Sequence, residues 1–391
     1  MQAQTRKKIA VLCSTDYNTY PVGGMMSFIK DAAPALSQRF DVDFWGVDAG
    51  SGLDSFTSGG EDFPVRFFAN VRTGPKLVPN LVRVTWQLLG NRAALLSEGY
   101  HGLYIHGINL NFALPASMMP KRINHVHGLT NPFLMKAHAS WTTRLIARRY
   151  HSYRRKVVQE SDLVLLAADR LGIERFRAEN PGKTRIEKIE NFCDTALFGS
   201  AAPVDRAAHG LPENARLIVH VGRFAYQKDP LLALEAFAAY RRAAGSPDDR
   251  LVMIGDGPLL DEGKAMAGTL GVAPQVLFLG NRARDEIAGW LAGADLYLYT
   301  SHANGYPISL AEAAQSGLPI VSTAVTGVHD LVLPGENGRL VESRNPEAFV
   351  APIAEALANR EEWGSRSRAL AAQYAPDIIL DRLCREIADV L

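Results

Sequence analysis

Short apolar runs alternate with amphipathic stretches along most of the chain, and this alternation restricts the possible folds more than any other feature. The first half holds apolar runs of strand length at residues 8–13, 41–47, 63–68, 102–106, 123–127 and 163–167. Helical patterns lie between several of them, at residues 25–38, 82–97 and 141–160. Because strands that alternate with helices form parallel sheets covered on both faces, the first half predicts an α/β domain.

The alternation stops once, at residues 200–215, where the sequence SAAPVDRAAHGLPENA has no clear periodicity. It then restarts, with strand-like runs at 217–221, 251–254, 276–279, 296–299 and 319–321. A chain of 391 residues exceeds one ordinary core. We therefore predict an α/β architecture of two Rossmann-like domains facing across a cleft, with the carboxyl ends of their strands turned toward it. The expected parts are an N-terminal domain 1–199, a linker 200–215, a C-terminal domain 216–375 and a helix 376–391 that packs back on the first domain.

Charge and cysteine usage narrow the class of protein. The net charge is +1, so no overall basic field favours nucleic acid. Cys13, Cys193 and Cys384 lie far apart and form neither a zinc pattern nor a disulfide framework. The first residues lack the apolar stretch of a signal peptide, and no window is long and apolar enough to span a bilayer. We expect a cytoplasmic protein.

Two cations follow the first strand of the second half. That strand continues into VGRFAYQKDP, which places Arg223 and Lys228 just beyond its carboxyl end. A guanidinium fork and a lysine point charge suit a diphosphate, although a solvated loop would contain the same residues. About eighty residues later, SHANGYPISLAEAAQSGLPIV carries a Gly-containing turn into a helix whose first N–H groups would favour phosphate. Glu312 lies one or two turns into that helix, where a carboxylate suits a ribose diol or simply the helix surface.

In these segments the chain resembles the retaining glycosyltransferases of the GT-B fold, specifically family 4. The resemblance covers the C-terminal half in order, through VGRFAYQKDP, VMIGDGP, VLFLGNR, ADLYLYTS, NGYPISLAEA with GLPIV, and GVHDLVLPGENGRLV. It implies that domain 1–199 binds the acceptor and that domain 216–375 binds the nucleotide sugar. It also implies that Arg223 and Lys228 hold the donor diphosphate and that Glu312 holds the ribose. It further implies a donor site with backbone support and base contacts from Gly222, Gly255, Gly257, Gly280, Arg282, Gly305, Tyr306, Ile308, Ser309 and Leu310.

One position departs from the family pattern. The family usually has a Glu eight residues before Glu312, where it contacts the donor sugar, and this chain has Asn304 there. Asn keeps hydrogen-bonding capacity but loses the charge. We favour altered sugar selectivity, with weakened catalysis or a non-catalytic homologue as the alternatives. Pro307 also lacks an N–H that could reach phosphate.

The N-terminal half gives weaker signals. Gly23 and Gly24 precede a helix and resemble the family's glycine loop, although a plain turn would look the same. INHVHGL places His125 and His127 on one face at a strand end, and no third ligand of suitable spacing accompanies them for a metal. The resemblance instead implies that His127 lies in the cleft beside the donor sugar.

Residues 141–158 carry six basic residues and no acid. Trp141, Leu145, Tyr150, Tyr153 and Val157 fall near one helical face. Such a helix could lie on an anionic membrane and present a lipid-linked acceptor, or it could pack on the sheet with a solvated basic back.

Together, the residues and the resemblance predict a metal-independent retaining glycosyltransferase without a bound cofactor. It would move a hexose from a UDP-, GDP- or ADP-sugar to a glycan or lipid-linked acceptor, in bacterial glycan or glycolipid assembly. No Asp-X-Asp cluster lies near the nucleotide site, and the two cations would take the metal's role. The alternatives are an epimerase, a phosphorylase or sugar-phosphate synthase, and a sugar-nucleotide sensor without turnover. An oxidoreductase is disfavoured because the first strand lacks the dinucleotide fingerprint.

Overall fold

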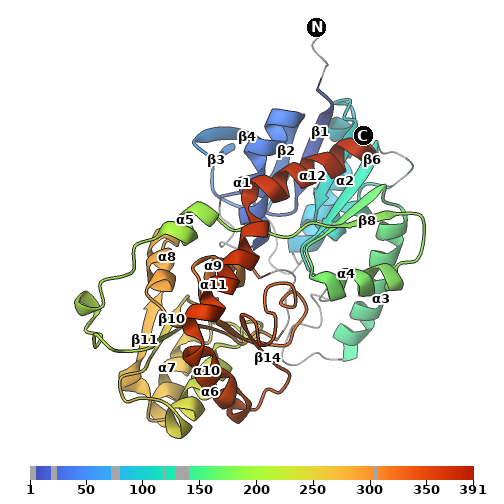
Figure 1. Cartoon of the computed structure of the whole chain (residues 1–391). Coiled ribbons are helices and arrows are strands. Elements are labelled where there is room, and N and C mark those ends of the chain that lie inside the picture. The colour runs from blue at the N-terminus through green and yellow to red at the C-terminus, as the bar shows by residue number, and fades with distance from the viewer. Residues whose placement is uncertain are drawn as a thin grey trace.

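The computed structural model describes residues 6–18, 24–71, 80–115, 117, 120–128, 141–302 and 307–391. It contains two mainly parallel β-sheets, each flanked by helices, in two successive parts of the chain (Figure 1). The predicted α/β fold of two Rossmann-like domains is therefore confirmed. None of the helices within the described ranges is long and apolar enough to cross a membrane.

The first sheet has eight strands in the order β3-β4-β2-β1-β5-β6-β7-β8. Its strands are β1 Lys8–Cys13, β2 Asp41–Asp48, β3 Ser55–Ser58, β4 Glu61–Asn70, β5 Gly102–His106, β6 Lys121–Val126, β7 Leu163–Leu166 and β8 Arg185–Lys188. Only the β3–β4 pair is antiparallel. The helices of this part are α1 Gly24–Arg39, α2 Asn80–Leu96, α3 Trp141–Gln159, α4 Arg170–Glu179 and α5 Thr195–Ser200, with a 3-10 turn η1 at Ile108–Phe112. β1 and β5 are buried almost throughout because their residues are apolar on both faces, as parallel central strands require.

The second sheet has six parallel strands in the order β11-β10-β9-β12-β13-β14. They are β9 Leu217–Val221, β10 Arg250–Ile254, β11 Val276–Gly280, β12 Leu296–Tyr299, β13 Ile320–Thr323 and β14 Gly338–Val341. The helices are α6 Pro230–Ala243, α7 Leu260–Thr269, α8 Arg284–Ala292, α9 Ile308–Gln315, α10 Val350–Ala358, α11 Arg360–Ala371 and α12 Pro376–Val390. The strand order reverses beside β9, so the loops after β9 and β12 diverge there, and this is where α/β sheets bind ligands.

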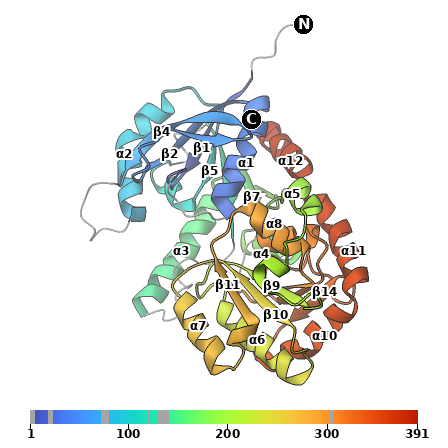
Figure 2. The same ribbon diagram turned by 90° about the vertical axis from the view of Figure 1, so that its left-hand side faces the viewer.

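The segment 200–215 lies against the second sheet's helices. Val204 N donates to Gly289 O at 3.0 Å, and the His209 ring lies 4.7 Å from the Trp290 ring. The last helix, α12, returns to the first part of the chain and contacts α1 (Figures 1 and 2). Its Arg382 pairs with Glu190, and Cys384 Sγ lies 3.7 Å from Ala35 O.

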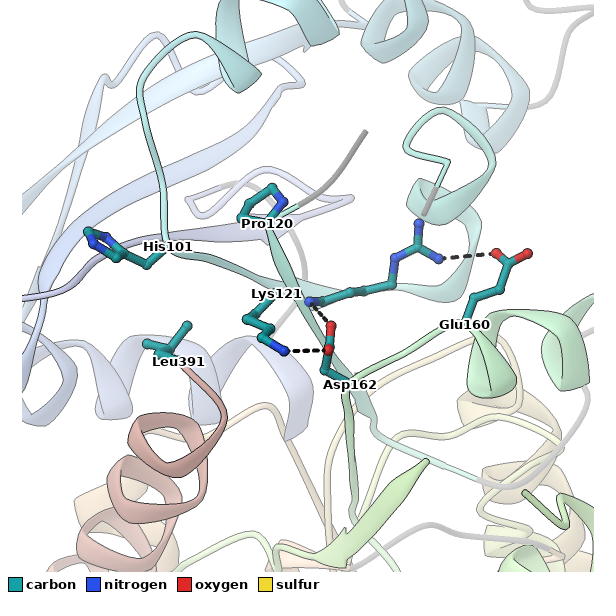
Figure 3. A pocket seen from close by; sticks show the side chains of 7 residues that line it. His101, Pro120, Lys121, Glu160, Asp162 and Leu391 are labelled. Atoms are coloured by element: carbon teal, nitrogen blue, oxygen red, sulfur yellow. Dashed lines mark hydrogen bonds and ion pairs between the residues drawn. The ribbon is translucent and has the colours of Figure 1, made fainter. Parts of the chain in front are cut away.

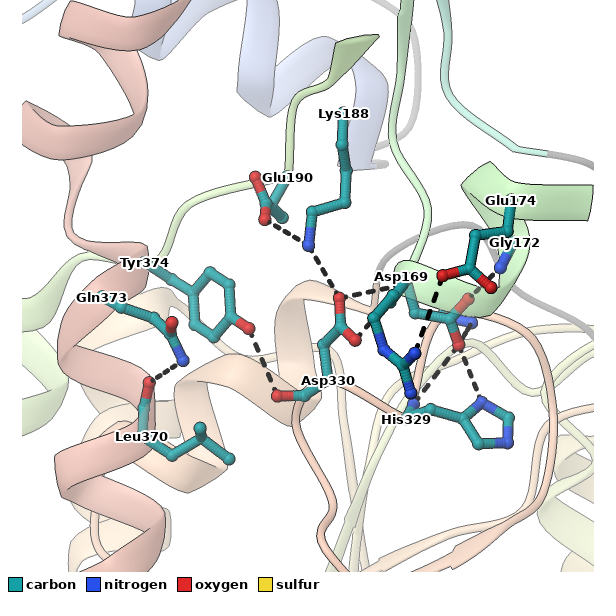
Figure 4. Close-up of polar contacts among 12 residues, drawn as sticks. Asp169, Gly172, Glu174, Lys188, Glu190, His329, Asp330, Leu370, Gln373 and Tyr374 are labelled. Carbon is teal, nitrogen blue, oxygen red and sulfur yellow. Dashed lines mark hydrogen bonds and ion pairs between the residues drawn. The ribbon is translucent and has the colours of Figure 1, made fainter. Parts of the chain in front are cut away.

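A polar network also joins the two parts near the carboxyl ends of β7, β8 and β13 (Figure 4). Asp169 is fully buried; one carboxylate oxygen accepts from Gly172 N at 2.8 Å and caps α4. The other oxygen accepts from Gly327 N at 2.8 Å and lies 2.7 Å from His329 Nδ1. Lys188 Nζ bridges Glu190 and Asp330, at 2.8 Å each. These contacts fix the loop 327–330 of the second part against α4 of the first.

Candidate functional site

The loops after β9, β10 and β11 are bound to one another through glycine backbone. Gly222 N donates to Ile254 O, and Gly255 N donates to Gly280 O, both at 2.9 Å. Gly255 has φ 139°, and a Cβ added there would lie 2.0 Å from Gly222 O. Gly257, with φ 151°, approaches Phe224 O in the same way. Only glycine fits these conformations and contacts. The glycines therefore let the ends of three neighbouring strands pack closely into one surface, called the glycine floor below.

The predicted diphosphate-binding residues lie at the glycine floor. Arg223 follows Gly222 directly and is exposed, whereas Lys228 is half-buried. A Cβ on Gly222 would be 3.7 Å from Lys228 Cβ, so the lysine stem runs alongside the glycine. Lys228 Nζ lies 3.4 Å from the hydroxyl of Tyr299, the last residue of β12. The lysine therefore stands at the place where the loops of β9 and β12 diverge.

The residue after Lys228 fixes this loop, and the sequence analysis missed it. Asp229 is the one non-glycine residue in the described part of the chain with a positive φ, at 43°. One of its carboxylate oxygens accepts from Leu232 N at 3.3 Å and caps α6. The other is bound by Arg344 and lies 3.1 Å from His302 Nε2. A strained backbone persists where surrounding contacts over-determine it, as they do here.

Glu312 is buried in the second turn of α9 rather than on a helix surface. Its Oε1 lies 3.2 Å from Arg284 Nη2, and that guanidinium is also 4.0 Å from Asp31 on α1. Burial raises the pKa of Glu312, and the charge and hydrogen bond of Arg284 act in the opposite direction. The carboxylate thus has a cationic partner from the first residue of α8, and that partner also lies near α1 of the first sheet.

The start of α9 carries the other predicted phosphate contacts. Ile308, Ser309 and Leu310 form its first turn, after Pro307 at the cap position without a side-chain cap. Leu310 N donates to Pro307 O at 3.2 Å, so Ile308 and Ser309 are the residues of this turn whose N–H groups could receive an anion. The predicted residues Asn304, Gly305 and Tyr306 lie outside the described residues.

Three histidines meet at the carboxyl ends of β5 and β6. His106 pairs in register with His125, and His127 follows one residue after β6. His106 Nδ1 lies 2.8 Å from His127 Nε2, and Tyr104 OH lies 2.6 Å from His125 Nδ1. Phe28 of α1 packs against His125 and His127. Burial lowers the pKa of His127 to about 3 and lowers the pKa values of His106 and His125 well below the ordinary range, so all three rings are neutral at physiological pH.

The expectation that His125 and His127 lack a third histidine was wrong. Nitrogens of all three rings lie within 4.8 Å of one another, because parallel neighbours β5 and β6 end at the same edge. The His125 and His127 rings, however, stack at 4.1 Å with planes 15° apart. Since a ring nitrogen's lone pair lies in the ring plane, the lone pairs of these two rings lie in separate, nearly parallel planes and do not converge well on one ion. The arrangement suits hydrogen bonding: His106 fixes the orientation of His127.

The remaining predicted residues are more peripheral. Gly24 is the first residue of α1, and Gly23 lies outside the described residues. Arg282 is exposed and lies 3.7 Å from Glu286. On the predicted basic helix α3, Val157 is buried in the protein, so this part of the apolar face packs inward.

A polar cavity of about 520 Å³ lies at the opposite edge of the first sheet, away from these residues (Figure 3). Lys121, Asp162 and the terminal Leu391 line it, at the amino ends of β6 and β7. The chemistry predicted from the sequence is at the carboxyl ends, so this cavity is not part of the candidate site.

The fold is that of GT-B glycosyltransferases. The sucrose-phosphate synthase of Thermosynechococcus elongatus superposes with a TM-score of 0.79 over 98% of this chain and 99% of that one, at 18% identity. HepE of Anabaena, solved in complex with UDP-glucose, superposes with a TM-score of 0.68 over 98% of this chain and 99% of that one, at 19% identity.

Residues 202–375 match the family model of glycosyl transferases group 1. A D-inositol 3-phosphate glycosyltransferase of Mycolicibacterium gilvum is 31% identical over 247 residues, which are 60% of this chain and 54% of that protein. LpsE of Rhizobium meliloti, a lipopolysaccharide core biosynthesis glycosyltransferase, is 25% identical over 290 residues, 71% of this chain and 82% of LpsE. The chain spans about half the length of the first two curated relatives it matches.

Proposed function

We propose that this protein is a retaining, metal-independent glycosyltransferase of family 4 that moves a hexose from a nucleoside-diphosphate sugar to a glycan or lipid-linked acceptor. The observation that carries the proposal is the position of Lys228, beside Gly222 and Tyr299 where the β9 and β12 loops diverge. A cation held there, with exposed Arg223 close by in sequence, suits the charge that develops on a leaving diphosphate. UDP and UDP-glucose in the HepE complexes support the same donor class.

In this mechanism, Arg223 and Lys228 bind the diphosphate and stabilise it as the glycosidic bond breaks. The first turn of α9 adds N–H donors to the same group. Glu312 accepts from the ribose hydroxyls, which must compete with Arg284 for the carboxylate. His127 stays neutral and, oriented by His106, offers a hydrogen bond to the donor sugar. The two cations take the part that a divalent metal has in other transferases, and the departing phosphate accepts the acceptor's proton.

We further propose that the reaction belongs to bacterial glycan or glycolipid assembly in the cytoplasm. LpsE, with its lipopolysaccharide name, supports this class of acceptor. The three cysteines are free and buried, which is compatible with a reducing compartment.

The first test is a thermal-shift panel of UDP, GDP, ADP and their common sugar conjugates, measured with and without EDTA. Binding to the native state raises the apparent melting temperature by mass action. We expect one nucleotide series to raise it in the wild type and in Lys264→Ala, an exposed lysine on α7, but not in Lys228→Ala. A shift that survives Lys228→Ala, or that EDTA abolishes, would contradict the assignment.

The second test separates a transferase from its alternatives. The nucleotide sugar identified by the panel is incubated with candidate acceptors, and the anomeric configuration of the product is determined by NMR. We expect retention of configuration. Conversion of the donor without acceptor would indicate an epimerase, and binding without turnover would indicate that Asn304 marks a sensor.

A further inference from the structure

An exposed apolar groove lies on the flank of the first sheet formed by α2, η1 and α3. Its lining is Val82, Thr85, Trp86, Asn109, Phe112, Tyr150 and Tyr153, around a cavity of about 320 Å³. Trp86 is 72% exposed and Phe112 is 65% exposed, which makes them two of the most exposed large hydrophobic side chains in the described chain. Figure 2 shows α2 and α3 on one flank of the molecule, with α12 on the other side. Exposed aromatic residues gathered at one groove mark an interaction surface.

The segment of the chain that contains this groove is rich in basic residues. Residues 71–159 contain 13 Lys and Arg residues and one acid, Glu98. The rest of the chain contains 29 Lys and Arg residues against 40 Asp and Glu residues, so the overall net charge of +1 hides an excess of cations in this segment. Glu98 is paired with Lys8 and Arg66, which belong to β1 and β4 outside the segment. α2, η1 and α3 themselves carry no acid.

Cations flank the groove on α3. Arg149 and Lys156 are exposed and lie four residues before and three residues after Tyr153, so they share its side of the helix. The Tyr153 hydroxyl donates to Ile108 O at 3.3 Å, which holds α3 against η1. Lys156 Nζ also lies 3.7 Å from Glu160 Oε1. The groove is thus apolar at its centre, with Arg149 and the ion-paired Lys156 at its edge.

We propose that this groove and its basic edge dock the protein on an anionic lipid bilayer, with Trp86 and Phe112 inserted among the headgroups. Tryptophan favours the membrane interface, and Lys and Arg are attracted to anionic headgroups. A nucleic acid would need the cations but gains little from an apolar groove. The proposed membrane contact is thus a surface built by α2, η1 and α3, and not the single helix 141–158.

The position of the groove in the fold gives membrane docking a function, and this function rests on the proposed transferase activity. η1 follows His106 after a single residue, so the groove begins next to the histidines at the strand ends. A bilayer held against the groove would bring the headgroup of a lipid-linked acceptor to those histidines. The acceptor class is then a lipid-linked sugar or phosphate rather than a free sugar.

The experiment is sedimentation of the full chain with vesicles of phosphatidylcholine alone or mixed with phosphatidylglycerol, at low and high salt. We expect binding to the anionic vesicles only, weakened by salt. Trp86→Ser with Phe112→Ser, and Arg149→Glu with Lys156→Glu, should each lower the apparent partition coefficient about tenfold or more. Trp86→Tyr should retain most of the binding, because tyrosine also favours the interface.

Matched controls come from other faces. Leu53→Ser with Ile378→Ser removes two equally exposed apolar side chains, and Lys264→Glu with Arg385→Glu reverses two exposed cations. Both controls should bind as the wild type does. Absence of vesicle binding, equal loss in the controls, or binding to duplex DNA that needs the cations but not Trp86 and Phe112 would each overturn the proposal. The nucleotide thermal shift is measured without lipid, so failure of the docking and failure of the donor assignment are separate results.

Discussion

Asp229 offers the sharpest test of how the loop that carries Lys228 is held. Its φ of 43° is a conformation that costs a non-glycine residue about 1–3 kcal/mol. Its carboxylate caps α6 through Leu232 N and binds Arg344 and His302. Three substitutions separate these contributions: Asp229→Asn, Asp229→Gly and Asp229→Ala.

The expected magnitudes follow from the contacts. Loss of the cap costs about 1 kcal/mol, and loss of a hydrogen bond to a charged group costs about 1.5–3 kcal/mol. Alanine loses both and keeps the strained backbone, so we expect a loss of about 3–4 kcal/mol. Glycine loses both but adopts this φ freely, and should be about 1 kcal/mol more stable than alanine. Asparagine keeps the cap and tolerates the conformation, so its loss should be about 1–2 kcal/mol.

The assay is urea unfolding of each variant, with the free energy of unfolding taken from the midpoint and slope. Asp194, which caps α5 with φ −71°, supplies the control, because glycine relieves no strain at a negative φ. Asp194→Gly should therefore show no advantage over Asp194→Ala. If Asp229→Ala were as stable as Asp229→Gly, the backbone at Asp229 would not be strained. The inference that Asp229 fixes the loop carrying Lys228 would then be refuted.

Two further outcomes concern the glycine floor and the buried carboxylate. Gly255→Ala should cost several kcal/mol, because its Cβ would meet Gly222 O at 2.0 Å, whereas Gly268→Ala, in open space on α7, should be neutral or stabilising in the same unfolding assay. In the folded state, burial raises the pKa of Glu312 above its ordinary value of 4.5. The wild type's free energy of unfolding therefore falls as the pH rises from that ordinary value to the raised pKa of the folded state. The free energy of unfolding of Glu312→Gln, relative to that of the wild type, should therefore increase as the pH rises through this range. The increase should be larger when both proteins also carry Arg284→Ala. A difference that does not depend on pH would contradict a buried carboxylate that Arg284 partly compensates.

The sequence predicted the elements that carry apolar runs and missed the polar ones. The predicted run 163–167 corresponds to β7 Leu163–Leu166, whose residues are all buried. Its neighbour β8, with the sequence RIEK, has no such run because it is an edge strand with one buried residue. β3 and β14 are four-residue strands of the same kind. Hydrophobic periodicity reflects burial, so a short edge strand with few buried residues has no recognisable pattern in the sequence.

The candidate site divides in the same way. Lys228 and Glu312 were found because local segments carry them, whereas Asp229 with Arg344 and Arg284 with Glu312 join positions 115 and 28 residues apart. Tertiary packing alone brings such partners together. His106 could have been found, since it ends the predicted strand 102–106 and parallel neighbours end at one edge.

The geometry also indicates which half of the site is fixed and which half can vary. Around Lys228, glycine contacts, a capped helix and the Arg344 pair leave little freedom, and this rigidity suits a diphosphate that all nucleotide-sugar donors share. Glu312 is different, since its partner Arg284 is 44% exposed and reaches toward Asp31 of the first sheet's α1. In the proposed mechanism, a ribose that binds the carboxylate releases this arginine toward α1, so donor binding would alter the contact between the two sheets. Selectivity for the acceptor would then rest with the first sheet, whose histidines lie beside the proposed docking groove, while Asn304 stays the position expected to alter selectivity for the sugar.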